Sequence, residues 1–279
     1  MEQNALREFL YRHERLLILT GAGCSTDSGI PDYRDREGGW KRAPPVMFRA
    51  FMDEPATRQR YWARSLVGWS RFGGALPNDA HHALAQLERE DRIELLVTQN
   101  VDRLHQAAGS SDVLDLHGRL DLVRCMQCAH QMPRDEMQTA LLRHNGDWAH
   151  LDGRAAPDGD ADIEAADFSA FHVPECSRCG GVLKPEVVFF GESVPADRVA
   201  RAMRSLEHSD AVLVVGSSLM VYSGYRFVLA AAQSGKPVAA INLGRTRADG
   251  LLTLKVVESC ATALSFLLGK SPSAAAHAN

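Results

Sequence analysis

The sequence lacks any long apolar segment and any excess of positive charge. No run of apolar residues reaches the roughly 18 residues that a membrane-spanning helix requires. The first residues also lack the apolar core of a signal peptide. The formal net charge is -4 at pH 7, which gives no electrostatic reason to expect general nucleic-acid binding. We therefore expect a cytoplasmic protein that binds neither membranes nor nucleic acids.

Cysteine is scarce, with 6 residues in a chain of 279, and a disulfide framework is not expected in a cytoplasmic protein. Four of the cysteines nevertheless fall in two Cys-x-x-Cys pairs, Cys125 with Cys128 and Cys176 with Cys179. This spacing predicts a tetrahedral zinc site with four thiolate ligands. Because four cysteines leave no open position on the metal, we expect one structural zinc ion that holds a small module together.

Length and composition indicate one large α/β domain with a small added module. The hydrophobic fraction of 45% and the charged fraction of 24% are ordinary for a globular chain. We expect residues 1–120 and 184–270 to form the two parts of a Rossmann-like domain, a parallel sheet with helices on both faces. Residues 121–183 would form a zinc-ribbon module, and residues 271–279 a flexible tail. Within the module, residues 145–167 are rich in Asp, Ala and Gly, which predicts an acidic surface loop of low order.

A glycine-rich stretch, Gly21–Arg34, follows the apolar run Leu16–Leu19, which has the composition of a buried parallel strand. Gly21 and Gly23 would allow the backbone to approach a pyrophosphate closely, and a helix opening near Ser25 would offer free N–H groups. The alternative is a glycine turn that serves only the fold, because the complete Gly-x-Gly-x-x-Gly pattern is absent. The continuation of the stretch favours a dinucleotide site at this first strand-to-helix turn.

Two charged residues, Asp32 and Arg34, lie at the end of this stretch. An arginine fork suits a phosphate, and a carboxylate suits either ribose hydroxyls or the arginine itself. We therefore expect these residues to be paired charges beside the phosphate site.

Polar or small residues follow three further predicted strands, Ile93–Thr98, Ala211–Val215 and Val238–Ile241. In open α/β sheets, ligands bind beside the carboxyl ends of the strands, so we expect these residues to line one site. They are Gln99, Asn100, Asp102, Gly216, Ser217, Ser218, Asn242, Leu243 and Gly244. Asn100 and Asp102 could equally cap a helix, and the two roles are compatible.

His117 follows another short predicted strand, Val113–Leu116, and precedes Gly118. A histidine in such a place is more often structural when it stands alone, but here it joins a row of strand ends that carry ligand-type residues. Its side chain titrates near neutral pH, which suits a general base acting on a ribose hydroxyl.

The stretch Leu183–Glu192 returns the chain to the main sheet. Pro185 and Gly191 bracket an apolar run in it, which predicts a short strand with an accessible edge. Such an edge could pair with an extended peptide. A plain core strand is the alternative.

Taken together, these segments resemble the sirtuins, the silent-information-regulator family of NAD-dependent protein-lysine deacylases. The similar segments follow the family's order from end to end, and they are Gly21–Arg34, Thr98–His105, His117 with Gly118, both cysteine pairs, Lys184–Glu192, Gly216–Leu219 and Asn242–Gly244. Three further stretches, 61–64, 156–160 and 221–227, are similar to class II members of the sirtuin-4 type and their bacterial relatives.

The resemblance implies a cleft between the Rossmann-like domain and the zinc module, where NAD as co-substrate meets an acyl-lysine protein or peptide. It implies that His117 and Asn100 are catalytic and that nicotinamide and O-acyl-ADP-ribose are released. We expect the protein to be a monomer. The implied NAD contacts are Gly21, Ala22, Gly23, Ser25, Asp32, Tyr33, Arg34, Trp40, Gln99, Asn100, Asp102, Gly216, Ser217, Ser218, Asn242, Leu243, Gly244 and Cys260. The implied substrate contacts are Tyr61, Arg64, Val188, Phe189, Phe190, Gly191, Glu192 and Val221.

Two other functions compete with deacylation. Mono-ADP-ribosyl transfer to protein would use the same site with a different acceptor. The resemblance to the sirtuin-4 type is the reason to consider this reaction. A zinc-ribbon adaptor that binds NAD only as a ligand is the more distant alternative, because the sequence near the cysteine pairs is acidic and offers no basic binding face.

Tyr61 and Arg64 suggest which acyl group the site accepts. The two residues lie three apart in a helical pattern, hence on one face, and the pair is similar to the Tyr-x-x-Arg of sirtuins that select acidic acyl groups. A bidentate arginine could hold a distal carboxylate of the acyl chain. We therefore expect longer or acidic acyl groups to be preferred over acetyl, with a surface arginine beside a core tyrosine as the alternative.

Overall fold

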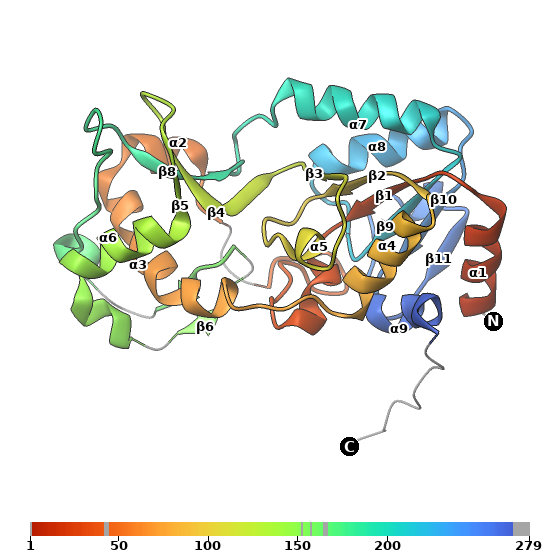
Figure 1. Cartoon of the computed structure of the whole chain (residues 1–279), viewed down its shortest axis with the longest axis horizontal. Helices are drawn as coiled ribbons and strands as arrows, with labels where there is room; N and C mark the ends of the chain where they lie inside the picture. The colour runs from red at the N-terminus through yellow and green to blue at the C-terminus, as the bar shows by residue number, and fades with distance from the viewer. Residues whose placement is uncertain (1, 42–44, 152, 157, 164–166, 270–279) are drawn as a thin grey trace, which may run out of the picture.

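The structure is a computed structural model of the chain, and it describes all residues except 1, 42–44, 152, 157, 164–166 and 270–279. The predicted tail, 271–279, lies outside the described residues. The chain forms a large α/β part and a smaller part, with one long strand, β4 (Gly118–Cys125), leading from the first into the second (Figure 1). Among the described residues, no helix combines the length and the apolar character needed to cross a membrane.

The large part is built on a parallel sheet of six strands in the order β11-β10-β9-β1-β2-β3. Three central strands, β1, β9 and β10, consist of residues that are buried throughout, as expected for strands that are covered on both faces. This confirms the predicted α/β fold and its strand segments. The six strands are β1 Leu16–Thr20, β2 Ile93–Thr98, β3 Val113–Asp115, β9 Ala211–Val215, β10 Val238–Ile241 and β11 Leu254–Val256.

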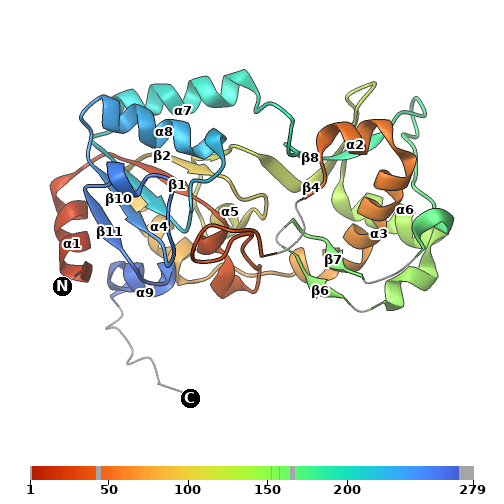
Figure 2. The ribbon, with the colours of Figure 1, turned by 180° about the vertical axis from the view of Figure 1, so that it is seen from behind.

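Alternate residues of β1 face two separate hydrophobic cores. Leu16 and Ile18 pack under α1 (Glu2–Arg12), α4 (Asp79–Arg89) and α9 (Cys260–Leu264). Leu17 and Leu19 pack under α7 (Ala196–His208) and α8 (Tyr222–Gln233) on the opposite face. Figures 1 and 2 show α7 and α8 on one side of the sheet and α4 and α9 on the other. The carboxyl ends of the strands therefore remain the open edge of this layered fold.

The smaller part has a core of its own, which combines aromatic residues with Cys125 and Cys176. Its antiparallel sheet has the order β5-β4-β8, with β5 Gln131–Pro133 and β8 Leu183–Val187. Its helices are α2 Phe48–Asp53, α3 Pro55–Phe72 and α6 Arg134–His144. Residues 46–67 contribute to this core together with residues 123–187, so the module predicted at 121–183 is packed on helices that precede it in the chain.

The acidic segment 145–167 contains regular secondary structure among its described residues. Its described residues form a 3₁₀ turn, Gly146–His150, and a small hairpin of β6 (Arg154–Ala155) and β7 (Ala161–Asp162). Asp160 is buried beside this hairpin, with a relative exposure of 5%. Composition alone suggested a solvated loop, but a buried acid that finds a cationic partner can anchor such a segment.

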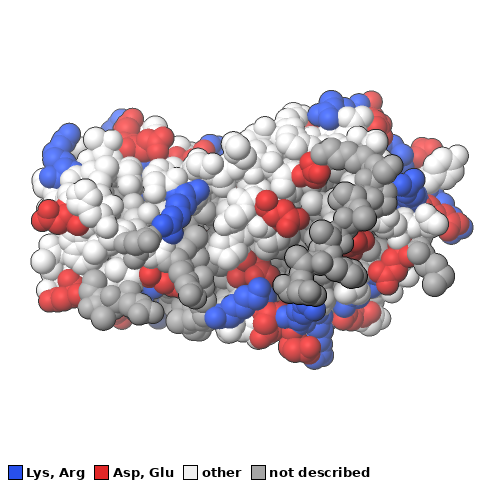
Figure 3. Space-filling model, turned by 90° about the horizontal axis from the view of Figure 1, so that it is seen from below, with Lys and Arg blue, Asp and Glu red and all other residues white. Residues whose placement is uncertain are grey.

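Charged residues of both signs are interspersed on the face shown in Figure 3. Lys and Arg side chains lie among Asp and Glu side chains there.

The passage from the large part into the smaller one depends on Gly118. This residue begins β4 with φ at +84°, and a Cβ added to it would lie 2.0 Å from the carbonyl oxygen of Glu186 in the paired strand β8. The backbone N–H of Val188 donates to the carbonyl of His117 over 2.8 Å at the same crossing. A side chain at this position would therefore push β8 away from β4 immediately beside His117.

We expect Gly118→Ala to destabilise the protein more than Gly29→Ala, measured as the free energy of unfolding in urea. Gly29 has the same φ of +84° but no atom within 4 Å of an added Cβ, so its substitution isolates the backbone strain. That strain costs about 1–2 kcal/mol, and the collision at Gly118 should add about 1–3 kcal/mol. Equal losses in the two variants would contradict the close contact between β4 and β8.

Candidate active site

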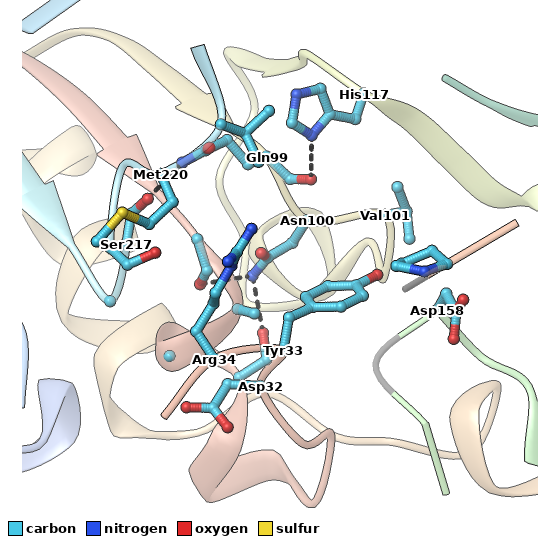
Figure 4. A pocket seen from close by; sticks show the side chains of 18 of the residues that line it. Asp32, Tyr33, Arg34, Gln99, Asn100, Val101, His117, Asp158, Ser217 and Met220 are labelled. Carbon is cyan, nitrogen blue, oxygen red and sulfur yellow. Dashed lines mark hydrogen bonds between the residues drawn. The ribbon is translucent and has the colours of Figure 1, made fainter. Parts of the chain in front are cut away.

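A cavity of about 970 Å³ lies at the carboxyl ends of the parallel strands, between the two parts of the molecule. Its wall includes the residues that follow β1, β2, β9 and β10, together with His117 and the segment after β8. Of the site residues predicted from the sequence, other than the four cysteines, all but Arg64 line this cavity. Figure 4 shows a group of these side chains, with His117 and Asp32 at opposite ends of it.

The glycine loop after β1 packs directly against the loop after β9. The N–H of Gly23 donates to the carbonyl of Gly216 over 2.8 Å. A Cβ on Gly21 would lie 2.8 Å from the Cβ of Ser217, and one on Gly216 would lie 2.2 Å from the nitrogen of Cys24. Glycine is therefore required by backbone contact between the two loops, and this contact sets the floor of the cavity.

The helix predicted to open near Ser25 is replaced by two short 3₁₀ turns, η1 (Ala22–Cys24) and η2 (Thr26–Ser28). Gly29, with φ at +84°, ends the second turn. The free N–H groups at this corner thus come from short turns, and no regular α-helix follows β1 directly.

Asn100 and Asp102 are tied to the same loop through Ser25. The side-chain amide of Asn100 donates to the carbonyl of Gly21 and to the hydroxyl of Ser25, each over 3.0 Å, and Ser25 donates to a carboxylate oxygen of Asp102 over 2.7 Å. The other carboxylate oxygen of Asp102 accepts the N–H of Leu104 at the start of α5 (Leu104–Ala107). Asp102 therefore caps a helix and lines the cavity, and burial raises the pKa of its carboxyl group.

His117 is held from both ring nitrogens. Nδ1 lies 3.0 Å from the backbone carbonyl oxygen of Gln99, and Nε2 lies 2.7 Å from Oγ of Ser223 (Figure 4 shows the first contact). Burial lowers the pKa of His117 to about 4, a shift that the carbonyl of Gln99 opposes and that the charges of Arg198 and Arg226 reinforce. The ring is therefore neutral at pH 7. Because a carbonyl oxygen can only accept, Nδ1 carries the proton, and the electron pair on Nε2 accepts the hydroxyl of Ser223.

The charges at the other end of the cavity are arranged differently from our prediction. Asp32 pairs with Lys41 and not with Arg34. Arg34 stacks on Trp40, with 3.6 Å between the guanidinium carbon and the ring centroid, and donates to the carbonyl of Gly38 over 2.9 Å. Both Asp32 and Arg34 still line the cavity, so each can face a ligand, but the predicted pairing between them is wrong.

The segment after β8 provides the wall that leads into the smaller part. β8 is an edge strand of the antiparallel sheet within the described residues. It begins before Pro185 and ends at Val187, so the strand lies earlier than the apolar run in which we predicted it, and Phe190 forms only an isolated bridge with Met47. Glu192 fixes the turn that follows, because it forms an ion pair with Lys184 over 3.1 Å and accepts the N–H of Phe189 over 2.9 Å. The ring of Phe189 packs on Tyr61 with 5.4 Å between ring centroids.

Arg64 does not reach the cavity. Its guanidinium donates to Asp160 and to Asp162, over 2.8 Å in each case, and its side chain keeps a relative exposure of only 18%. The prediction that Arg64 holds a carboxylate of the acyl group is therefore wrong, because the protein supplies the carboxylates. Tyr61 does line the cavity, and the charge of Asp158, another cavity residue, contributes with burial to raising the pKa of Tyr61 and of Tyr33.

The four predicted metal ligands come together at the far end of the smaller part. The sulfur atoms of Cys125 and Cys179 are 3.5 Å apart, and those of Cys128 and Cys176 are 3.7 Å apart. All four sulfurs lie within 4.8 Å of one another. Tetrahedral zinc with Zn–S bonds of about 2.3 Å places neighbouring sulfurs about 3.8 Å apart, so these distances fit such an ion.

A second buried cluster, Cys24, His81 and His105, lies behind the glycine loop. Its polar atoms are largely used within the fold: His105 contacts the hydroxyl of Thr20 over 2.9 Å, and His81 accepts the N–H of Asn78. Burial lowers the pKa of His81 to about 4 and that of His105 well below its usual range, so both rings are neutral. The cluster supports the glycine loop from the core side.

Several cavity residues were not among the predicted site residues, and three of them bear on the chemistry: Asp158, Ser223 and Arg226. Ser223 and Arg226 belong to the stretch 221–227, which we singled out only for its resemblance. The available signal for Ser223 was its place in the sequence. It is the second residue of a helix that begins shortly after a strand end with ligand-type residues. Asp158 belongs to the stretch 156–160, which was also singled out only for its resemblance, and its position at the cavity depends on the hairpin of β6 and β7.

Comparison with known proteins gives a consistent picture. The sequence model of the Sir2 family matches residues 21–223, more than half of the chain. The chain is 68% identical to an NAD-dependent protein deacetylase of Xanthomonas campestris pv. campestris (strain 8004) over 263 residues, which cover 94% of this chain and 90% of that one. It is 65% identical to NAD-dependent protein deacetylase 2 of Bradyrhizobium diazoefficiens over 268 residues, covering 96% and 98%.

Solved structures are similar over nearly the whole length. A Sir2 structure with a p53 peptide and NAD+ aligns with a TM-score of 0.75 at 28% identity, covering 96% of this chain and 98% of that one. A Sir2 protein bound to a propionylated peptide gives a TM-score of 0.75 at 29% identity, with the same coverage.

We expect Arg64→Ala to lower the free energy of unfolding by about 3–5 kcal/mol, because it leaves the buried carboxyl group of Asp160 without its cation. Arg12→Ala is the matched control: Arg12 pairs with Glu8 on the surface, with 67% of its side chain exposed, and should lose less than about 1 kcal/mol. Urea unfolding of both variants measures the difference. A loss in Arg64→Ala no larger than that of the control would show that the pair with Asp160 does not anchor the hairpin.

Proposed function

The chain belongs to the Sir2 family, and we propose that it is an NAD-dependent protein-lysine deacylase. The observation that carries the proposal is the meeting of three features in one cavity. These are a glycine loop at the first strand end, a neutral histidine whose Nε2 is a hydrogen-bond acceptor, and the turn that follows an edge strand. The relatives' printed names support deacetylation, and two of the similar structures hold peptides.

The residues of the cavity suit NAD. Close packing of the Gly21 and Gly216 loops leaves only backbone at the cavity floor, which lets a pyrophosphate approach and bind N–H groups. Ser217, Ser218 and Asn242 offer hydroxyl and amide groups along the same edge. When bound, NAD supplies the ADP-ribose that accepts the acyl group and the nicotinamide that leaves.

The catalytic residues would then have different roles, which follow from where they lie in the cavity. Asn100 and Asp102 are fixed to the glycine loop through Ser25 and can orient the nicotinamide end. His117 can take a proton from a ribose hydroxyl at Nε2, because burial keeps the ring neutral and the carbonyl of Gln99 holds the proton on Nδ1. The positive charge that then forms on the ring is stabilised by that same carbonyl oxygen.

The peptide substrate would pair beside the edge of β8 and send its acyl-lysine toward His117. The segment 188–192, whose turn is fixed by Glu192, and Val221 on the opposite side would border the entry. Main-chain hydrogen bonds to a strand edge can bind peptides of many sequences. The packed rings of Phe189 and Tyr61 would restrict which substrate side chain enters the cavity.

We further propose that longer uncharged acyl groups are preferred over acetyl. The cavity of about 970 Å³ lies near the upper limit for small-molecule sites, so it can hold a dinucleotide and a sizeable acyl chain. An acidic chain loses its support, because Arg64 is paired within the protein and Asp158 presents a carboxylate to the cavity. Membership of the sirtuin-4 type remains a proposal that rests on the resemblance of the stretches 61–64, 156–160 and 221–227. No contact among the described residues favours mono-ADP-ribosyl transfer over deacylation.

Purified protein with NAD should convert butyryl-lysine and longer acyl-lysine peptides faster than acetyl-lysine, and glutaryl-lysine slowest, as measured by mass spectrometry of the peptides. His117→Ala should lose more than about 100-fold in this rate, because a positioned general base contributes about 10²- to 10⁴-fold. It should still fold and bind NAD. Unfolding of His117→Ala would assign the ring to the scaffold, and turnover close to that of the unchanged protein would exclude it as the base.

We also propose that the four cysteines hold one structural zinc ion. The sulfur–sulfur distances fit a tetrahedral ion, and a closed shell of four thiolates leaves it no part in the reaction. Cys125 and Cys176 also belong to the core of the smaller part, so the metal would join its two cysteine pairs to the helices.

Cys176→Ser should lower the zinc content from one ion per chain to near zero and unfold the smaller part, since the binding energy of a structural ion is also folding energy. Metal analysis and circular dichroism measure the two effects. Cys260→Ser is the control, because Cys260 lies at the cavity and not in the cluster. Full zinc content in Cys176→Ser would contradict the four-cysteine site.

A further inference from the structure

The basic nitrogen of His117 is not free in this structure. A neutral imidazole has one N–H and one electron pair, and the N–H is directed from Nδ1 to the carbonyl of Gln99. The electron pair on Nε2 therefore accepts the hydroxyl of Ser223, at 2.7 Å. A ribose hydroxyl cannot donate to Nε2 while this hydrogen bond stands, because the single electron pair is already in use.

Gln99 positions both partners of this hydrogen bond, His117 and Ser223. Its backbone carbonyl binds the ring of His117, while its side chain donates to Ser217 over 2.7 Å and to the carbonyl of Thr20 over 3.1 Å. Gly224 packs against that side chain, since a Cβ added to it would lie 2.5 Å from Oε1 of Gln99. The first turn of α8 is thus fixed against the end of β2.

Ser223 lies in this first turn and is buried, with a relative exposure of 9%. Its backbone position is set by the contact of Gly224 with Gln99, so its hydroxyl is presented to Nε2 by the helix itself. Rotation about a single bond is enough to withdraw the hydroxyl, whereas moving the ring of His117 would break the bond to Gln99.

We propose that Ser223 is a positioning residue whose hydroxyl caps Nε2 of His117. The hydroxyl leaves Nε2 only when a bound ribose hydroxyl takes its place. The inference rests on the proposed deacylase function. In the transfer step, the ribose hydroxyl displaces Ser223 and donates to Nε2. Its proton then passes to Nε2, and the electron pair of the broken O–H bond stays on the oxygen, which forms the new bond to the acyl carbon. The bond between that carbon and the lysine nitrogen breaks, and the lysine nitrogen takes up the proton from Nε2 as it leaves as the amine.

The hydrogen bond from Ser223 to Nε2 slows acyl transfer, because that step needs Nε2 as its proton acceptor. It leaves nicotinamide release unaffected, since that earlier step needs no proton acceptor at Nε2. Removing a competing hydrogen bond worth about 0.5–1.5 kcal/mol corresponds to about a 2- to 13-fold change in rate. Ser223→Ala should therefore speed acyl transfer by about that factor in single-turnover assays with NAD and a butyryl-lysine peptide. The exchange of labelled nicotinamide into NAD should keep its rate.

Ser223→Thr is the matched variant, because it keeps a hydroxyl at the same position and should keep the original transfer rate. Unchanged or slower transfer in Ser223→Ala would overturn the proposal, as would an equal acceleration in both variants. Thermal unfolding of both variants shows whether a rate change reflects a damaged fold, and an altered nicotinamide exchange rate would assign Ser223 to the scaffold of the whole site.

A second readout is independent of any reaction. With ¹⁵N-labelled histidine, His117 should show a protonated Nδ1 and an unprotonated Nε2 in the unchanged protein. The Nε2 resonance should shift in Ser223→Ala and stay in place in Ser223→Thr. A protonated Nε2 in the unchanged protein would overturn the proposal. If this readout holds while no acyl-lysine peptide is converted, the cap is real and the proposed function is the part that fails.

Discussion

The contact between the two loops at the ends of β1 and β9 is the constraint on which the site depends. Gly21, Gly23 and Gly216 meet backbone to backbone, with 2.8 Å between the nitrogen of Gly23 and the carbonyl oxygen of Gly216. Any side chain at Gly21 or Gly216 would separate the loops. Asn100 and Ser25 are attached to this floor by hydrogen bonds, and Gln99 bonds to Ser217 from the neighbouring strand end. The polar groups that face a ligand are therefore placed by main-chain packing.

Burial gives His117 its chemical state. Removal from water lowers its pKa to about 4 and keeps the ring neutral, while two fixed partners decide which nitrogen carries the proton. The same principle operates behind the loop, where His81 and His105 are neutral for the same reason. Arg64, by contrast, stays charged because Asp160 and Asp162 accompany it. Its charge therefore serves to hold the hairpin of β6 and β7 beside α3 and leaves none for a ligand.

The sequence predicted those features that depend on backbone direction and on local spacing. Parallel strands end on one edge, so the residues after β1, β2, β9 and β10 had to meet, and the two cysteine pairs had to converge if they shared an ion. Side-chain partners far apart in the chain were beyond this reasoning. Helical spacing placed Tyr61 and Arg64 on one face, but the acids that bind Arg64 lie 96 and 98 residues later, in a segment whose composition suggested low order. The contact between His117 and Ser223 spans 106 residues and depends on how α8 docks.

The central claim is that one cavity joins cleavage of NAD to removal of an acyl group from lysine, and the stoichiometry of a single reaction tests it most directly. Nicotinamide, O-acyl-ADP-ribose and deacylated peptide should form in equal amounts from NAD and an acyl-lysine peptide, and no free lysine should appear when NAD is omitted. Release of nicotinamide without deacylated peptide, or deacylation without NAD, would contradict the account.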